Sequence, residues 1–206
     1  MARYTGPKNR LARSEGVDLG LKSLGSKARA SLLRRLNVPP GQHGPKGRRK
    51  ISGYAQQLRE KQKARRLYGV LERQFRRYFE KALKFKGNTG EALMQQLERR
   101  LDNIIYRLGF APTRASARQL ITHGHVVVND QKLSFPSYQA RPNDVITLTS
   151  KGLSVPAVKK LLEEKNPVIP AWLDRKGPVG KLVKVPTRSE IEAEIKEQMI
   201  VEFYSR

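Results

Sequence analysis

The sequence predicts an α+β protein with a basic irregular N-terminal extension, a helical domain and a small module in which a helix pair lies on an antiparallel sheet. Three observations carry this prediction. Residues 1–52 are dense in Gly, Pro and cations. Apolar residues then recur with helical spacing as far as residue 108, and short runs rich in Val and Ile follow between residues 126 and 148.

Charge is large and unevenly distributed along the 206 residues. There are 42 Lys and Arg against 18 Asp and Glu, a formal net charge of +24. Residues 1–86 hold 24 of the basic residues and five of the acidic ones, whereas residues 87–206 hold 18 and 13. Such a charge repels itself, and binding to a polyanion offsets the repulsion. The asymmetry favours a nucleic-acid contact surface in the first half; a solvated basic face with no specific partner is the alternative.

Composition excludes several classes of protein. The chain has no cysteine, so disulfides, thiolate zinc sites and thiol nucleophiles are excluded. No apolar run approaches the ~18 residues of a membrane span. The first residues, MARYTGP, are not followed by the apolar stretch of a secretory signal. We therefore expect a soluble, cytoplasmic polyanion binder with no membrane contact.

The extension, residues 1–52, is predicted to be irregular. Pro, Gly and cations crowd residues 39–50 (PPGQHGPKGRRK), and this mixture does not support a regular helix or strand. A segment of this kind becomes ordered against a partner, for which a phosphate backbone is the obvious candidate.

Two helices are predicted next. Residues 54–66 are rich in Gln, Arg, Lys and Leu, which favour helix. Residues 70–85 place an apolar stripe on one side, made of Leu71, Phe75, Tyr78, Phe79 and Ala82. The opposite side carries four cations, Arg73, Arg77, Lys81 and Lys84. The local excess of cations favours contact with RNA or DNA; an ordinary amphipathic helix with a solvated face is the alternative.

A single helix is predicted to span the apolar positions from Leu93 to Leu108. It has the cleanest apolar period in the chain, which we interpret as core: Leu93, Leu97, Leu101, Ile104, Ile105 and Leu108. The break GNTG at residues 87–90 precedes it, with Thr89 as the expected N-cap. Gly109 is expected to end it.

A shorter helix is predicted from Thr113, its N-cap, to about His123, with Gly124 closing it. Arg114 and Arg118 are four residues apart and share one face near the N-terminus, where free backbone N–H groups and the helix dipole attract anions. This arrangement predicts a phosphate clamp; arginines that merely solvate the helix are the alternative.

Short strands complete the module. Residues 126–128 and 131–133 flank an Asn129-Asp130 turn and predict a hairpin, and residues 145–148 predict a further strand. Residues 91–150 are therefore expected to form a helix pair on a small antiparallel sheet.

The C-terminal part is predicted less regularly. A short helix is expected over residues 156–165, before a stretch punctuated by Pro and Gly. Ser189 and Glu192 fit a capping box that begins a helix to about Met199, and residues 201–204 alternate as a terminal strand.

These elements define three predicted domains. Residues 1–52 are the basic extension. Residues 53–90 are the helical part of an N-terminal domain, completed by about residues 150–206, and residues 91–161 are the helix-and-sheet module.

No catalytic constellation is visible. Neither GxxxxGK[ST] nor GxSxG occurs. His123 and His125, two residues apart, fit no metal-binding spacing and are more simply histidines of a turn near phosphate. We predict no enzyme activity, no cofactor, no metal and no small-molecule substrate. An RNA-modifying or nucleotide-using enzyme is the alternative that the missing motifs disfavour. A DNA-compacting protein is disfavoured by the balanced, well-cored second half.

Long collinear motifs now point to a family. The opening MARYTGP, then PGQHG at residues 40–44 and QLREKQK at residues 57–63, resemble bacterial small-subunit ribosomal protein four. So do the segments YGVLERQFR, RLDN with YR, ARQL and the final VEFYSR. The similarity runs from the first residue to the last, and residues 99 to about 161 resemble the RNA-binding module named after that family.

The resemblance implies a structural constituent of the small ribosomal subunit, in the cytoplasm or in an organellar ribosome. It implies a primary binder of 16S rRNA that nucleates assembly of the subunit body, and a contact with small-subunit protein five tied to translational accuracy. The basic segment of Lys46, Arg48 and Arg49 would lie near the point where mRNA enters.

One departure concerns zinc. Zinc-bearing members of the family place cysteines where this sequence has Asn9, Ala12, Ser26 and Ser31. The chain therefore resembles the cysteine-free form, and we expect rRNA contact alone to order the extension.

Candidate rRNA-binding residues are cations, hydroxyls and histidines within these segments. They are Arg3, Tyr4, Arg10, Arg13, His43, Arg59, Lys61, Lys63, Arg65, Arg66, Arg73, Arg76, Arg77, Lys81, Thr113, Arg114, Arg118, His123 and His125.

Overall fold

The computed structural model describes residues 3–47, 50–164, 168–191 and 194–205. The chain divides into two compact units, Met1–Gly90 with Ala193–Arg206, and Glu91–Glu192. In the part of the chain that is described, no helix has the length and apolar character needed to cross a bilayer.

The first unit opens with two short helices, α1 (Lys8–Glu15) and α2 (Lys27–Arg34), and a 3-10 turn, η1 (Gly44–Lys46). They pack around a small core of Ala12, Leu19 and Leu32. The prediction that residues 1–52 are irregular is therefore wrong for these segments. Three buried apolar residues spread over twenty positions make no visible period, although together they suffice to hold two helices.

Side-chain hydrogen bonds supplement this core. Asn9 donates to the Ala28 carbonyl over 2.9 Å, and Arg29 pairs with Asp18 over 2.8 Å. The chain thus supplies contacts of its own within the extension, and the expectation that rRNA contact orders it stays a prediction.

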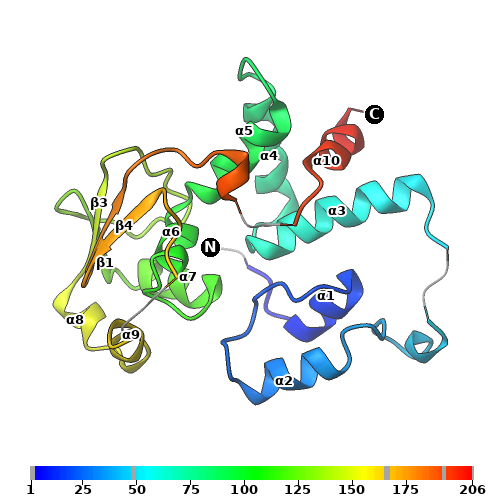
Figure 1. Cartoon of the computed structure of the whole chain (residues 1–206), viewed down its shortest axis with the longest axis horizontal. Helices are drawn as coiled ribbons and strands as arrows, with labels where there is room; N and C mark the ends of the chain where they lie inside the picture. The colour runs from blue at the N-terminus through cyan, green and yellow to red at the C-terminus, as the bar shows by residue number, and fades with distance from the viewer. Residues whose placement is uncertain (1–2, 48–49, 165–167, 192–193, 206) are drawn as a thin grey trace. The chain divides into compact units, whose positions relative to one another are not determined.

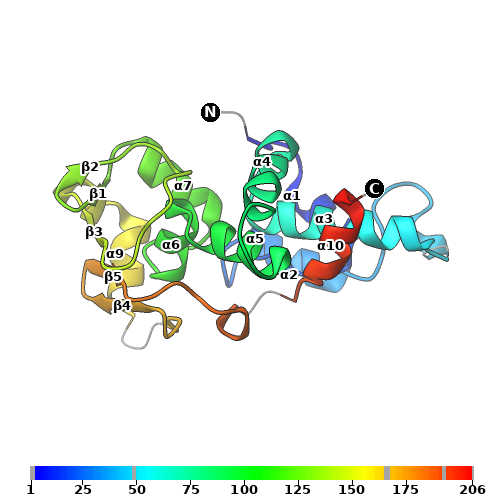
Figure 2. The same ribbon diagram turned by 90° about the horizontal axis from the view of Figure 1, so that it is seen from above.

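Three further helices complete the first unit: α3 (Gly53–Leu67), α4 (Glu72–Ala82) and α10 (Glu197–Tyr204). Ser52 caps α3 by accepting from the Ala55 N–H. The apolar stripe predicted for α4 is confirmed, since Phe75, Tyr78 and Phe79 are buried. Figures 1 and 2 show α10 alongside α3, so the end of the chain returns to the helices near its start.

Two C-terminal predictions are wrong. Residues 201–204 belong to helix α10 and not to a strand, because Ile200 and Tyr204, four apart, both face the helices that α10 packs against. The predicted helix from Ser189 is instead a 3-10 turn, η2 (Arg188–Glu190), whose capping box pairs Thr187 with Glu190. Glu192 lies outside the described residues.

The predicted helix over residues 93–108 is two helices, α5 (Thr89–Glu98) and α6 (Leu101–Arg107). Arg100 between them has extended backbone, with ψ 137°. Its neighbours bond a distant segment instead: the Leu101 N–H reaches the Tyr138 carbonyl over 2.9 Å, and the Ala140 N–H reaches the Arg99 carbonyl over 3.0 Å. The apolar period does not reveal that helical hydrogen bonds are replaced here by bonds to a distant segment, since the buried residues keep their spacing across the break. The cap of α5 is Asn88, which accepts from the Gly90 N–H, and not Thr89.

The second unit contains a five-stranded antiparallel sheet in the order β2-β1-β3-β5-β4. Its strands are β1 (Val126–Val128), β2 (Gln131–Lys132), β3 (Val145–Leu148), β4 (Leu173–Lys176) and β5 (Val179–Leu182). The predicted hairpin is confirmed: Asn129 and Asp130 have φ of 47° and 65°, as its tight turn requires.

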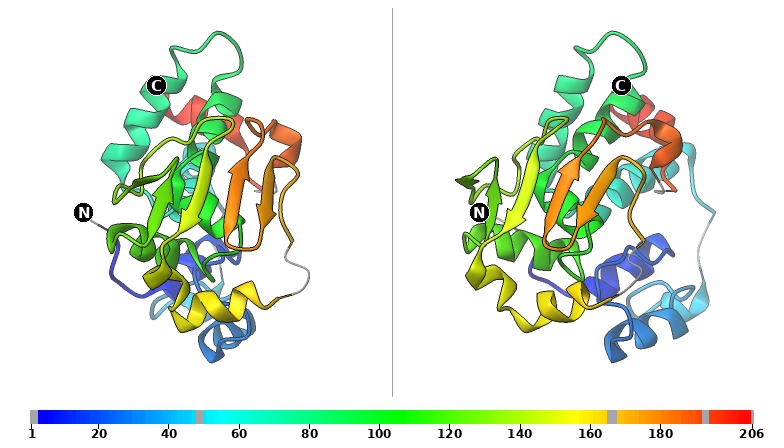
Figure 3. Two further views of the ribbon diagram at one scale, coloured as in Figure 1. Left: turned by 90° about the vertical axis from the view of Figure 1, so that its left-hand side faces the viewer. Right: turned by 60° about the vertical axis from the view of Figure 1, so that its left-hand side comes forward.

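Helices α6 and α7 (Arg114–Thr122) pack on one face of this sheet, as the views of Figure 3 allow the reader to follow. Ile105, Ile121 and Ile146 lie in the shared core. Two short helices, α8 (Ser150–Leu153) and α9 (Pro156–Leu162), follow β3, and the helix predicted over residues 156–165 corresponds to α9.

The β4–β5 hairpin was not predicted, and it changes the assignment of the C-terminal part. Strand β5 pairs with β3, Ile146 opposite Gly180, and Trp172 is buried in the same core. Residues 150–192 therefore group with the second unit and do not complete the helical domain. A Cβ at position 180 would meet the Leu108 side chain at 2.3 Å, so any larger residue at this position of β5 would force the buried Leu108 to shift.

Candidate nucleic-acid interface

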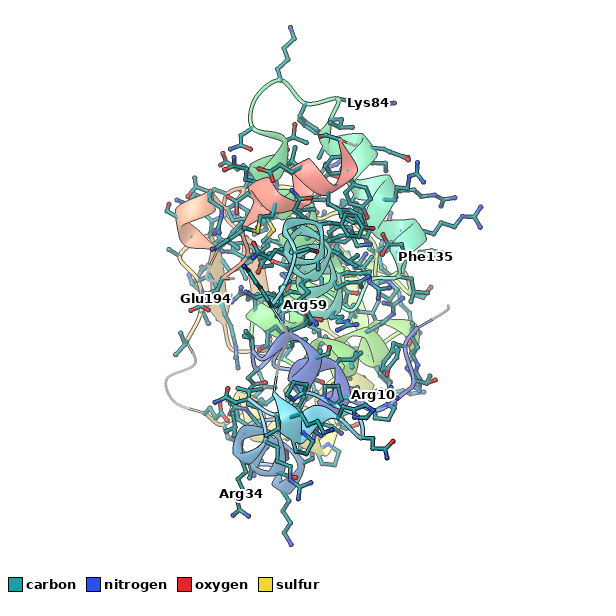
Figure 4. All side chains as sticks on the ribbon, turned by 90° about the vertical axis from the view of Figure 1, so that its right-hand side faces the viewer. Arg10, Arg34, Arg59, Lys84, Phe135 and Glu194 are labelled. Carbon is teal, nitrogen blue, oxygen red and sulfur yellow. The ribbon has the colours of Figure 1, made fainter. Side chains whose placement is uncertain are left out.

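Helix α4 presents its cations to solvent. Arg73, Arg77 and Lys81 are exposed on the side opposite the buried aromatic residues. Arg76 is also exposed and pairs with Glu80 over 3.2 Å. The strip continues past the helix to Lys84, whose side chain extends outward in Figure 4. Because the core fixes the helix, the spacing of these cations is fixed as well.

Not every predicted contact residue is exposed. Lys61 is 5% exposed and donates to the Glu72 carboxylate over 2.7 Å. Arg13 donates to the Val38 and Pro39 carbonyls, and Arg66 to the side chains of Ser14 and Glu15. These cations hold the first unit together.

Arg59, Lys63 and Arg65 occupy an intermediate position. Arg59 is exposed, although it donates to the Ser14 carbonyl over 2.6 Å. Lys63 lies 3.8 Å from Glu60, and Arg65 lies 3.6 Å from Glu72. Their charges are partly neutralised within the protein.

The N-terminal residues that were predicted to bind RNA are mostly at the surface. Arg3, Tyr4, Arg10 and His43 are exposed, and Figure 4 labels Arg10 and, on α2, the outward-pointing Arg34. Lys46 is exposed as well, while Arg48 and Arg49 lie outside the described residues.

A cavity of about 610 Å³ opens beside Glu72, lined by Lys61, Gln62, Arg65, Glu72, Arg76, Phe203 and Tyr204. Burial acts to raise the pKa of Glu72, but hydrogen bonds from Lys61 and Tyr204 outweigh it and hold the pKa below its usual value. Burial and the same carboxylate raise the pKa of the Tyr204 hydroxyl. The carboxylate thus stays ionised and ties α3, α4 and α10 together.

The second candidate surface is the start of α7. Thr113 caps the helix as predicted, accepting from the Ser116 N–H over 3.2 Å. The half-buried Arg114 donates from Nε to Asn103 Oδ1 over 2.7 Å, and its guanidinium carbon lies 4.5 Å from the centre of the Tyr106 ring. Two neighbours on α6 therefore hold this arginine.

Arg118 does not match its partner in the predicted clamp. It is 8% exposed and lies 3.9 Å from Asp102. The prediction that both arginines lie at the surface is wrong for Arg118. The buried Arg118 lies near the carboxylate of Asp102, sixteen positions earlier in the chain. The spacing of residues on a single helix does not reveal such a distant partner.

Buried ion pairs surround this site. Arg100, fully buried, donates to both oxygens of Asp102 over 3.0 and 2.5 Å, and Arg107 pairs with Glu98 over 3.1 Å. Asn103 and Tyr106 are the residues that sequence reasoning missed. The sequence could have indicated them through the segments RLDN and YR, because these polar residues are embedded in an otherwise apolar helix.

His123 and His125 lie after α7, with ring centroids 6.1 Å apart. Over the described ranges, no three histidine or acidic side chains gather as a metal site.

Two known protein families match consecutive parts of the chain. Residues 3–98 match the family described as Ribosomal protein S4/S9 N-terminal domain, and residues 99–146 match the S4 domain. The chain is therefore built from a ribosomal-protein domain followed by an RNA-binding domain.

Full-length relatives identify the family more narrowly. Small ribosomal subunit protein uS4 of Dictyoglomus turgidum is 50% identical, uS4A of Symbiobacterium thermophilum is 51% identical, and uS4 of Herpetosiphon aurantiacus is 52% identical. Each alignment covers 100% of this chain and 100% of the relative. The chain belongs to the uS4 family of small ribosomal subunit proteins, which are structural, RNA-binding components and not enzymes. The predicted resemblance is confirmed.

Proposed function

We propose that this protein is a primary binder of 16S rRNA that nucleates assembly of the body of the small subunit. Its membership in the uS4 family gives a structural, rRNA-binding role in that subunit. The observation that carries the finer proposal is the cation strip of α4, here defined as Arg73, Arg77 and Lys81 on the helix with Lys84 just after it.

The strip suits a phosphate backbone for two reasons. Its cations project from a helix whose other side is anchored by Phe75 and Phe79, so they need little reorganisation on binding. Residues 1–86, which contain the strip, carry 24 basic residues against five acidic ones. Phosphate contacts of this kind set the position of a protein on RNA and supply a large share of the affinity.

Burial and internal contacts together sort the candidate rRNA contacts into two groups. We propose direct contact for the exposed or half-exposed residues of the two surfaces: Arg3, Tyr4, Arg10, His43, Arg73, Arg76, Arg77, Lys81, Arg114, His123 and His125. The other candidates are held by the internal contacts described above, Arg59 among them although its side chain is exposed: Arg13, Arg59, Lys61, Lys63, Arg65, Arg66, Thr113 and Arg118.

Three further assignments are part of the proposal. The protein contacts small-subunit protein five and, with it, contributes to translational accuracy. The exposed Lys46 and the basic residues that follow it lie near the point where mRNA enters. The assembled subunit is cytoplasmic. All three derive from the family resemblance.

A charge-matched pair of triple variants tests the proposal. Replacing Arg73, Arg77 and Lys81 with Ala should weaken binding to 16S rRNA. Each lost phosphate contact should also reduce the slope of log K against log salt by ~0.7–0.9. The control replaces Lys151, Lys159 and Lys160 of α8 and α9, three exposed lysines, with Ala.

The measurement is a filter-binding titration across a salt series, with 16S rRNA and with bulk RNA of equal length. The strip variant should lose more affinity for 16S rRNA than the control does. Equal losses in the two variants would show that only net charge matters, and wild-type curves that coincide for the two RNAs would refute specific recognition.

A further inference from the structure

Asn103 stands at the centre of a chain of polar contacts between α5, α6 and α7. It is 1% exposed. Its amide Nδ2 donates to the Glu98 carboxylate over 2.6 Å and to the Glu98 carbonyl over 3.0 Å. Its Oδ1 accepts from Arg114 Nε over 2.7 Å. The orientation of the amide is determined by its partners, because a carboxylate only accepts and a guanidinium only donates.

Glu98 is itself fixed. It is fully buried, and Arg107 pairs with it over 3.1 Å. The contacts therefore run from Arg107 through Glu98 and Asn103 to Arg114. The first three are held by burial and charge, so the position of Asn103 Oδ1 is set before any RNA arrives.

Arg114 is constrained at two points by this arrangement. Asn103 holds its Nε, and the Tyr106 ring lies against its guanidinium. A guanidinium has five N–H donors in one plane, so fixing Nε and the ring face fixes the orientation of that plane. The surrounding surface at the start of α7 is the one where backbone N–H groups and the dipole also favour an anion.

We propose that Asn103 is a positioning residue that holds Arg114 in the orientation in which it binds an RNA phosphate. The inference rests on the proposed function, in which Arg114 contacts rRNA directly. Asparagine suits the role because one side chain must both donate to Glu98 and accept from Arg114. Aspartate could accept but would place a second carboxylate against Glu98, and leucine could do neither.

A double-mutant cycle separates positioning from contact. Arg114→Ala should weaken 16S rRNA binding by about 10-fold or more, as expected for a hydrogen bond to a charged group. Asn103→Ala should weaken it by about 3-fold or more in the wild-type background, because Arg114 loses its preorganisation. In the Arg114→Ala background the same change should cost nothing further.

Each outcome has a distinct meaning. If Arg114→Ala leaves affinity unchanged, Arg114 is not an RNA contact, and both the contact and its positioning are refuted. If Arg114→Ala weakens binding but Asn103→Ala does not, or costs as much without Arg114 as with it, the contact stands and the positioning role is refuted. Ile104→Val, a buried truncation of the same helix, is the control and should leave affinity unchanged.

A second measurement needs no variant at position 103 and therefore survives if Asn103→Ala fails to fold. In the free full-length protein, the Nε–H of Arg114 should exchange with solvent at least about 10-fold more slowly than that of the exposed Arg34, since an internal hydrogen bond protects it. NMR reports both rates, with the Arg114 signal assigned by its loss in Arg114→Ala. Equal exchange rates would refute the positioning role.

Discussion

Glu72 connects three helices through side-chain contacts alone. Lys61 of α3 and Tyr204 of α10 both donate to its Oε1, over 2.7 and 2.8 Å. Tyr204 also stacks on Phe79, with ring centroids 4.6 Å apart. Tyr204 therefore helps to attach α10 in two ways, by aromatic contact and by a charge-assisted hydrogen bond.

Tyr204→Phe should raise the pKa of Glu72 toward its usual value, because one of the hydrogen bonds that lower it is removed. The folded-state pKa lies below the unfolded value, so this group's stabilisation is present above the unfolded pKa of ~4.3 and is lost as the pH falls through the folded pKa. The folding stability of the variant should therefore decrease less than that of the wild type as the pH falls through this range. NMR titration of the Glu72 carboxyl measures the pKa, and an unchanged value contradicts the account. Tyr54→Phe is the control.

At the scale of elements, the break between α5 and α6 is stabilised by a buried ion pair. Arg100, whose backbone interrupts the helix, is fully buried against Asp102. Breaking a buried pair costs more than an exposed one contributes, since the remaining charge stays out of water without a counter-charge.

Asp102→Asn should therefore destabilise the second unit by about 3–5 kcal/mol. Glu80→Gln removes the exposed pair with Arg76 and should change stability by no more than about 1 kcal/mol. Urea unfolding followed by the fluorescence of Trp172, the single tryptophan and buried in that unit, measures both. Similar midpoints for the two variants would contradict the importance of the buried pair.

Several elements specified by neighbouring residues could be predicted from the sequence, whereas those specified by distant residues could not. The Thr113 cap and the Asn129-Asp130 turn each depend on interactions within four neighbouring residues. The break at Arg100 depends on backbone bonds to residues 138–140, and strand β5 depends on pairing with β3. The same distinction holds at the candidate site: the exposed cations of α4 were predictable from one helix, whereas the burial of Arg118 was not.

At the scale of the whole molecule, the two units differ in net charge. The unit of residues 1–90 and 193–206 carries 26 basic and eight acidic residues, while residues 91–192 carry 16 and ten. Repulsion among like charges destabilises a compact state, and a bound polyanion offsets it. The benefit of a polyanion should thus be concentrated in the first unit, whichever nucleotides it contacts.

Hydrogen exchange of the full chain can measure this asymmetry. Adding heparin at low salt should increase the protection of backbone amides in α3 and α4 more than in β3 and β5, because the repulsion that it offsets is greater in the first unit. Repeating the experiment at 1 M salt provides the control, since a screening length of ~3 Å leaves little electrostatic attraction and the difference should vanish. Replacing heparin with 16S rRNA should add protection at the start of α7, where Arg114 lies. Equal protection of the two units at low salt would mean that the charge asymmetry has no energetic consequence for the folded protein.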